Sequence, residues 1–89
     1  MKEIRWNASK SERLKQTRGA SFEEILSSTF IGMKDHHAHV HQKIMLFEHK
    51  GYVWLVPFVE TEEVIFLKTL YPSRKYTKLH QRRKENENY

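Results

Sequence analysis

The chain has 89 residues and no cysteine, so it allows one small domain and excludes both disulfides and thiolate chemistry. No apolar run approaches the roughly 20 residues that a membrane-spanning helix needs. The opening Met-Lys-Glu-Ile-Arg-Trp lacks the apolar stretch of a signal peptide, and we therefore expect a cytoplasmic protein.

The net charge of +5 is unevenly distributed along the chain. Residues 19–67 carry a balance of −4, whereas residues 68–84 contain seven Lys or Arg and no acid. A segment of this kind favours an anionic partner, nucleic acid before a membrane surface. The simpler interpretation is a solvated helix face that continues into a frayed basic tail.

A short strand and a polar helix are predicted first. Residues 4–6 place two apolar side chains around a cation, which is typical of a strand. Asn7 or Ser9 can cap a helix over residues 9–17, because their side chains accept bonds from free backbone N–H groups. Gly19 is expected to end this helix in the left-handed conformation.

A second helix is predicted from residue 22 to about residue 29. Ser21-Phe-Glu-Glu24 has the capping-box pattern, with Ser at the cap and Glu three residues later. Apolar residues then recur at helical spacing on one face. They are Phe22, Ile25, Leu26 and Phe30.

Three strands with hairpin-length connections are expected next. Residues 40–48 alternate around an apolar centre, and Lys50-Gly51 supplies a turn into a strand over residues 52–56. Pro57 cannot donate to a ladder, so it predicts an edge or a bulge there. Residues 64–71 form the most apolar run and are predicted to be a strand that is central in the sheet.

A basic helix closes the predicted domain. Pro72 is expected to end the last strand, and Ser73 can cap a helix that continues to about residue 84. The order β-α-α-β-β-β-α predicts an α+β fold over residues 1–84, with an antiparallel meander, N-terminal helices packed on one face and a C-terminal helix. Residues 85–89 are predicted to be a polar, disordered tail. The predicted core includes Trp6, Phe22, Ile25, Leu26, Trp54 and Phe66.

Several short segments resemble the BrnT-like toxins. They are the opening Ile-x-Trp, the stretch Gly19-Ala-Ser-Phe-Glu-Glu-Ile25, the His-bearing connection Asp35-His-His-Ala-His-Val-His41 and the closing Pro72-Ser-Arg-Lys75. The similarity covers most of residues 3–78 and keeps the order of elements. It implies a toxin of a bacterial type II toxin–antitoxin pair, with a RelE/ParE-like fold. Such toxins cut RNA without a metal or cofactor and are held silent by a cognate antitoxin, which is also the usual link to operator DNA.

The chemistry of RNA cleavage selects the candidate residues. The 2′-hydroxyl attacks the adjacent phosphate, so an enzyme needs a base, an acid and cations for the growing charge. Arg74 and Lys75 are the first candidates, because they follow the last strand at a helix start where backbone N–H groups favour phosphate. Cations at a helix start oppose the helix dipole, which favours a functional reason for their presence. The alternative is that they simply lie on a solvated first turn. Tyr71 and Tyr76 flank the pair and can stack on a base, move a proton or simply pack.

The histidines between residues 36 and 41 allow several interpretations. In an extended chain His37, His39 and His41 share one face, a spacing that suits Zn²⁺ or Ni²⁺. No cysteine and no second ligand cluster accompany them, so we predict no metal site. A general acid or base role suits His39 or His41, and His41 is the predicted catalytic residue. A polar loop beside the antitoxin surface is the alternative.

The remaining cations are candidates for holding RNA. Positions 10 and 13 are neighbours on a helix, and such cations can grip the sugar–phosphate backbone without reading sequence. They can equally receive an acidic segment of an antitoxin. The predicted RNA-binding residues are Lys10, Arg13, Arg18, Lys68, Lys78 and Arg82.

Three functions therefore compete at this point. The leading hypothesis is a metal-independent endoribonuclease that cleaves mRNA and is neutralised by an antitoxin. The second is a non-catalytic nucleic-acid-binding module, which is favoured because Val40-His-Gln-Lys43 does not show the family's acidic residue with a following arginine. The third is a metal-handling protein built on the histidines.

Overall fold

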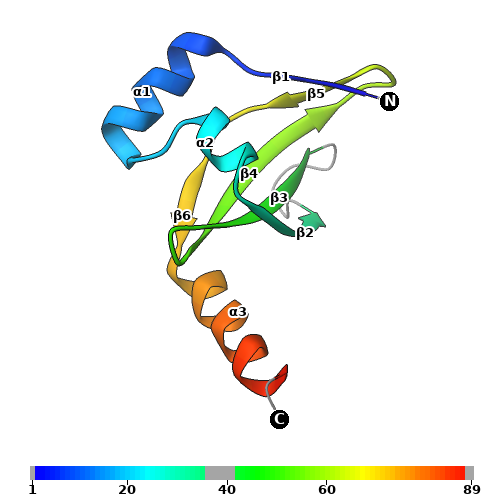
Figure 1. Cartoon of the computed structure of the whole chain (residues 1–89). Coiled ribbons are helices and arrows are strands. Elements are labelled where there is room, and N and C mark those ends of the chain that lie inside the picture. The colour runs from blue at the N-terminus through cyan, green and yellow to red at the C-terminus, as the bar shows by residue number, and fades with distance from the viewer. Residues whose placement is uncertain (1, 36–41, 88–89) are drawn as a thin grey trace.

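A computed structural model describes residues 2–35 and 42–87 (Figure 1). It confirms the predicted α+β class, with two helices near the N-terminus, a twisted sheet and a C-terminal helix. In chain order the elements are β1 (Glu3–Arg5), α1 (Ala8–Arg18), α2 (Phe22–Leu26), β2 (Thr29–Asp35), β3 (Gln42–His49), β4 (Tyr52–Glu60), β5 (Val64–Leu67), β6 (Tyr71–Ser73) and α3 (Arg74–Glu87). No helix in the described part of the chain is long and apolar enough to cross a membrane.

The sheet has the strand order β1-β5-β4-β3-β2, and β6 also pairs with β4. Strands β2 to β5 pair with their sequence neighbours in antiparallel fashion, which confirms the meander. β1 adds to β5 as a parallel edge strand. The turn between β3 and β4 has positive φ at both Lys50 and Gly51, as a two-residue hairpin loop requires.

The N-terminal capping signals are present in the structure. The Asn7 side chain accepts a hydrogen bond from Lys10 N at 2.9 Å, and Gly19 ends α1 with φ at 93°. Ser21 and Glu24 form the reciprocal bonds of a capping box at the start of α2. These local signals correctly predicted where both helices begin and where α1 ends.

The structure corrects the extent of the second helix. α2 ends at Leu26, and Thr29–Asp35 forms β2 instead of the last helical turn and a loop. Phe30 therefore does not belong to the apolar face of α2. Its ring packs edge-on against Phe47 of β3, with the ring centroids 5.5 Å apart. This cross-strand contact comes from a distant part of the chain, so helical periodicity does not reveal it.

The predicted strand over residues 64–71 is interrupted. β5 ends at Leu67, Lys68 N donates to Pro57 O at 2.8 Å, and pairing with β4 resumes in β6 at Tyr71. Pro57 lies inside β4, not at a sheet edge. It stands between the part of β4 that pairs with β5 and the part that pairs with β6, so its missing N–H falls in the gap between the two ladders. The middle strand of the sheet is therefore β4, with β5 between it and β1.

The main core lies between the sheet and the two N-terminal helices. Its centre consists of Phe22 and Ile25 of α2 against Trp54, Val56 and Phe58 of β4. Trp6 and Leu26 pack against this cluster, as predicted. The prediction for Phe66 is wrong, because this side chain remains 37% exposed. Glu23 accepts from Trp6 Nε1 at 2.8 Å and from Ser11 Oγ at 2.9 Å, and so joins α2 to α1 and to the segment that follows β1.

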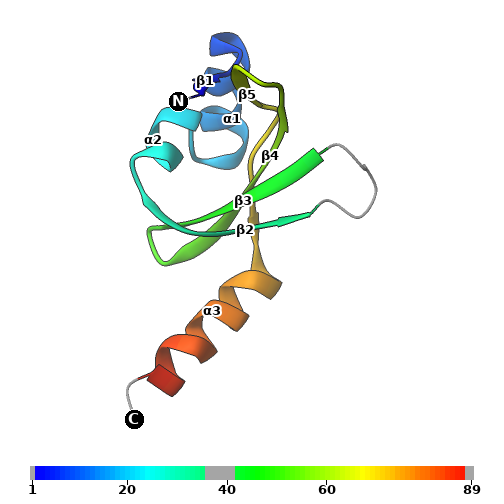
Figure 2. The same ribbon diagram turned by 90° about the vertical axis from the view of Figure 1, so that its right-hand side faces the viewer.

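α3 packs against the opposite face of the sheet (Figure 2). Val53 and Leu55 alternate with the core residues of β4 and point to this second face. Thr77 anchors the helix there, because its hydroxyl accepts from Val53 N at 2.8 Å and donates to Ser73 O at 2.6 Å. Ser73 caps the helix as predicted, but α3 reaches Glu87 and includes part of the predicted tail.

Candidate nucleic-acid site

A groove of about 870 Å³ separates β2 from α3 on the second face of the sheet. Its apolar floor comes from the strands, and most of its polar groups come from the helix. The lining residues are Ile31, Gly32, Met33, Lys34, Asp35, Leu46, Tyr76, Leu79, His80, Arg82, Arg83 and Lys84.

Helix periodicity determines which α3 residues line the groove. Tyr76, His80 and Arg83 follow one another at spacings of four and three residues, so they share one face. Thr77 fixes the rotation of the helix through its bonds to β4 and to Ser73. Arg74 and Lys78, each two residues from Tyr76, do not line the groove. The Thr77 anchor therefore determines that the helix face carrying Tyr76 and His80 turns toward the groove.

Lys34 and Tyr76 meet across the groove. The Lys34 ammonium donates a hydrogen bond to the Tyr76 hydroxyl and lies 4.5 Å from the centroid of the ring. A second ammonium, that of Lys75, lies 5.6 Å from the same centroid. The phenol oxygen thus accepts from a cation, which leaves the phenol's own proton to be donated to another group.

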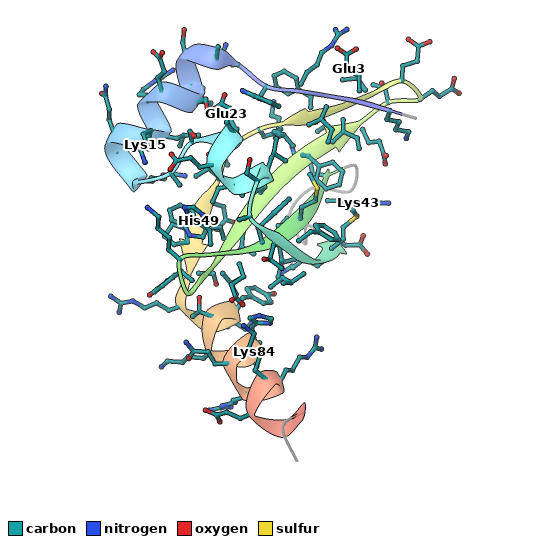
Figure 3. All side chains as sticks on the ribbon, viewed as in Figure 1. Glu3, Lys15, Glu23, Lys43, His49 and Lys84 are labelled. Carbon is teal, nitrogen blue, oxygen red and sulfur yellow. The ribbon has the colours of Figure 1, made fainter. Side chains whose placement is uncertain are left out.

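His80 and Glu48 form a second pair in the same region. His80 Nε2 bonds Glu48 Oε2 at 2.5 Å, and Lys84 Nζ donates to Glu48 at 2.9 Å. Figure 3 shows Lys84 on α3 below the sheet. The bond from Lys84 and then that from His80 hold the pKa of Glu48 below its usual value, although burial acts in the opposite direction. Glu48 is thus ionised near neutral pH and can orient the imidazole.

The open end of the groove is strongly cationic. Arg82, Arg83 and Lys84 are exposed consecutive residues on α3, and the helix carries no acid before Glu85. Guanidinium groups bind phosphate through two parallel hydrogen bonds, so this rim suits a sugar–phosphate backbone. The groove as a whole combines an imidazole, a phenol and an ammonium with cations for phosphate.

The predicted basic residues of α1 gather at a different place. Lys10, Arg13 and Arg18 line a hollow of about 230 Å³ together with Thr69. Arg18 donates to Leu70 O at 2.6 Å and to the Thr69 hydroxyl at 3.2 Å, so it also joins α1 to the segment before β6. Both views place α1 and α3 at opposite ends of the molecule (Figures 1 and 2).

The other sequence-predicted site residues are dispersed. Arg74 and Lys75 are exposed on the first turn of α3, and Tyr71 is half-buried in β6. Lys68 is exposed, with its ammonium 5.8 Å from the centroid of the Phe66 ring. Lys78 is exposed on α3, and of the six predicted RNA-binding residues Arg82 alone lines the groove. His41 and the neighbouring histidines lie outside the described residues.

Sequence reasoning missed Lys34, Glu48 and His80. They come from three separate elements, and the two pairs join residues 42 and 32 positions apart. The spacing of Tyr76 and His80 by four residues is the one local signal that could have indicated a shared helix face. Within residues 2–35 and 42–87, no three His, Cys, Asp or Glu lie close enough together to hold a metal ion.

Comparison with known proteins supports the fold. No protein-family model matches the chain, and no curated protein matches it by sequence. The chain is similar to a crystal structure described as the Brucella abortus ribonuclease toxin BrnT, with a TM-score of 0.54 and 16% sequence identity. The match covers 82% of this chain and 97% of that one. The resemblance predicted from the sequence is therefore confirmed at the level of the BrnT fold, whereas the RelE/ParE label still comes from the motifs alone.

Proposed function

We propose that this protein is the toxin component of a bacterial toxin–antitoxin pair and that it cleaves mRNA in the cytoplasm without a metal ion. The observation that carries the proposal is the groove between β2 and α3, where an imidazole, a phenol and several cations line one cavity. The fold adds support, because it is similar to a structure described as a ribonuclease toxin.

The predicted residues take supporting roles in this proposal. The Lys75 ammonium lies beside the ring of Tyr76, at the border of the groove. Arg74 precedes Lys75 in the first turn of α3. Tyr71, and His41 outside the described residues, stay candidate catalytic residues on the sequence pattern alone. Lys10, Arg13, Arg18, Lys68 and Lys78 extend the contact with RNA away from the groove.

A cognate antitoxin is the proposed protein partner. An acidic segment of it would compete with RNA for the same cations on α1 or α3. Operator DNA would be contacted only through that antitoxin. No cofactor is required, because attack by the 2′-hydroxyl of RNA needs an acid, a base and cations only.

The direct test is cleavage of RNA by the purified protein in a chelator. We expect cleavage of mRNA in EDTA and growth arrest when the protein is expressed. The Arg74→Ala, Lys75→Ala double variant is expected to weaken both effects, because the two cations lie beside the groove. Intact RNA after prolonged incubation with a folded protein, in EDTA and with Mg²⁺ alike, would contradict the proposal.

A non-catalytic nucleic-acid-binding module is the second candidate. The same side-chain pairs favour it, because Glu48 bonded to His80 and Lys84 also attaches α3 to β3 without any catalytic role. This module would bind RNA or DNA with affinity that falls steeply as salt rises, and would leave the strand intact. Binding without cleavage would distinguish it from the first candidate.

A further inference from the structure

His80 has the surroundings of a general base. Its side chain is 21% exposed and lines the groove, while Glu48 lies behind it and does not line the cavity. The bond between them uses His80 Nε2. An ionised Glu48 accepts a proton-bearing Nε2, so the free lone pair of the neutral ring lies on Nδ1. A carboxylate that orients one ring nitrogen and leaves the other for the substrate is the arrangement that activates imidazole bases.

The carboxylate is itself held in place. Lys84 donates to Glu48 from the next turn of α3, so both partners of Glu48 come from the helix while Glu48 comes from β3. The bonds from Lys84 and His80 to Glu48 therefore fix the position of the imidazole relative to the sheet. A histidine needed only for helix packing would gain little from a fixed tautomer.

The acid stands one helical turn away. Tyr76 and His80 are separated by four residues and line the same groove. Lys34 donates to the oxygen of Tyr76, so the phenol proton is free to leave toward a ligand. Arg83 follows His80 by three residues and lines the same groove, so a guanidinium is available there for the growing charge on phosphorus.

We propose that His80 is the general base of RNA cleavage, that Glu48 positions it, and that Tyr76 is the general acid. The inference rests on the proposed ribonuclease function. His80 Nδ1 takes the proton of the 2′-hydroxyl, and a bond forms between the 2′-oxygen and phosphorus. The bond from phosphorus to the 5′-oxygen breaks, and that oxygen receives the Tyr76 proton. The products are a 2′,3′-cyclic phosphate and a 5′-hydroxyl, and solvent returns the proton from His80 to Tyr76.

The test compares variants on a short fluorogenic RNA in EDTA. His80→Ala is expected to reduce kcat by about 10²-fold or more, the usual contribution of a general base. Added imidazole should restore part of this activity, which a purely structural histidine would not allow. Glu48→Gln should reduce kcat more than it changes KM, because it disturbs orientation and not binding. Gln81→Ala, at an exposed position on the same helix, is the matched control and should retain full activity.

The outcomes separate this inference from the proposed function. If the wild type cleaves RNA and His80→Ala cleaves it at a rate within threefold of the wild type, the catalytic assignment is wrong. The ribonuclease proposal would then still stand. A folded His80→Ala that is inactive and insensitive to imidazole would also overturn the catalytic assignment. If circular dichroism shows that His80→Ala is unfolded, His80→Gln replaces it, and normal binding of RNA with lost cleavage supports the assignment. Cleavage by His80→Gln at the wild-type rate refutes it, and an inactive wild type refutes the ribonuclease proposal itself.

Discussion

At the scale of single residues, the hydroxyl of Thr77 links the second face of the sheet to the helix that lines the groove. It lies at a buried position and bonds both Val53 N and Ser73 O. A buried backbone N–H without a partner costs about 1–3 kcal/mol. The geometry of the candidate site thus depends on a residue that never touches the groove.

Thr77→Val should therefore destabilise the protein more than its small change in shape suggests. The methyl group replaces the hydroxyl without a change in volume, so the loss comes from the unsatisfied Val53 N–H and is expected to be about 1–3 kcal/mol in urea unfolding. Thr17→Val is the matched control, because that hydroxyl bonds Arg13 O on the exposed side of α1. Its effect should stay within about 0.5 kcal/mol. Equal losses for the two variants would contradict the anchoring role.

At the scale of elements, the predictions succeeded where the cause is local. Asn7, Gly19 and the Ser21–Glu24 box act within one turn of chain, and each predicted its helix boundary. β2 was missed because Phe30 keeps helical spacing with Phe22 and Leu26, whereas its actual partner is Phe47 on β3. The interruption between β5 and β6 was missed because it depends on Pro57 across the sheet.

The same contrast between local and distant causes applies to the candidate site. The basic segment from residue 68 to residue 84 contains most of α3, which lines the groove, and Tyr76 was named as a neighbour of the predicted pair. Which cations face the groove could not be predicted, because the rotation of α3 is set by Thr77 and β4. The His80–Glu48 pair joins the helix to β3 and has no local signature.

Glu24 connects two elements, and its titration provides a test of their docking. It caps α2 and accepts a bond from Lys15 of α1 at 2.9 Å. That bond, followed by the one from the Ser21 backbone, lowers the pKa of Glu24 from 4.5 to about 2. Because the folded-state pKa lies below the ordinary value, the stabilisation is complete above about pH 4.5 and is lost as the pH falls through about 2.

Glu24→Gln should consequently reduce the acid sensitivity of folding. Above pH 4.5 we expect the variant to be less stable than the wild type, with the difference shrinking as the pH falls toward 2, where Glu24 becomes neutral. Urea midpoints measured at several pH values between 6 and 2 would follow this convergence. Glu62→Gln, in the exposed turn between β4 and β5, serves as the control. A difference that stays constant with pH would contradict the assignment.

At the scale of the whole molecule, the positive charge is concentrated on two helices that the sheet separates. α1 presents Lys10 and Arg13, whereas α3 presents Arg82 and Arg83, and the helices lie at opposite ends of the protein (Figures 1 and 2). The longest dimension of the molecule is 41 Å. A short RNA seated in the groove cannot reach α1, whereas a long strand can contact both ends.

The salt dependence of RNA binding should therefore vary with RNA length. Each phosphate contact contributes about 0.7 to the slope of log K against log salt for a single strand, so Arg82→Gln with Arg83→Gln should lower the slope by about 1.4 for any RNA. Lys10→Gln with Arg13→Gln should lower it for an RNA of about 30 nucleotides and leave it unchanged for one of about 5 nucleotides. Fluorescence anisotropy at several salt concentrations measures these slopes, with Gln81→Ala as the control. If the α1 double variant changes the slope for the short RNA as well, the two basic surfaces form one site, and the groove is not where RNA binding begins.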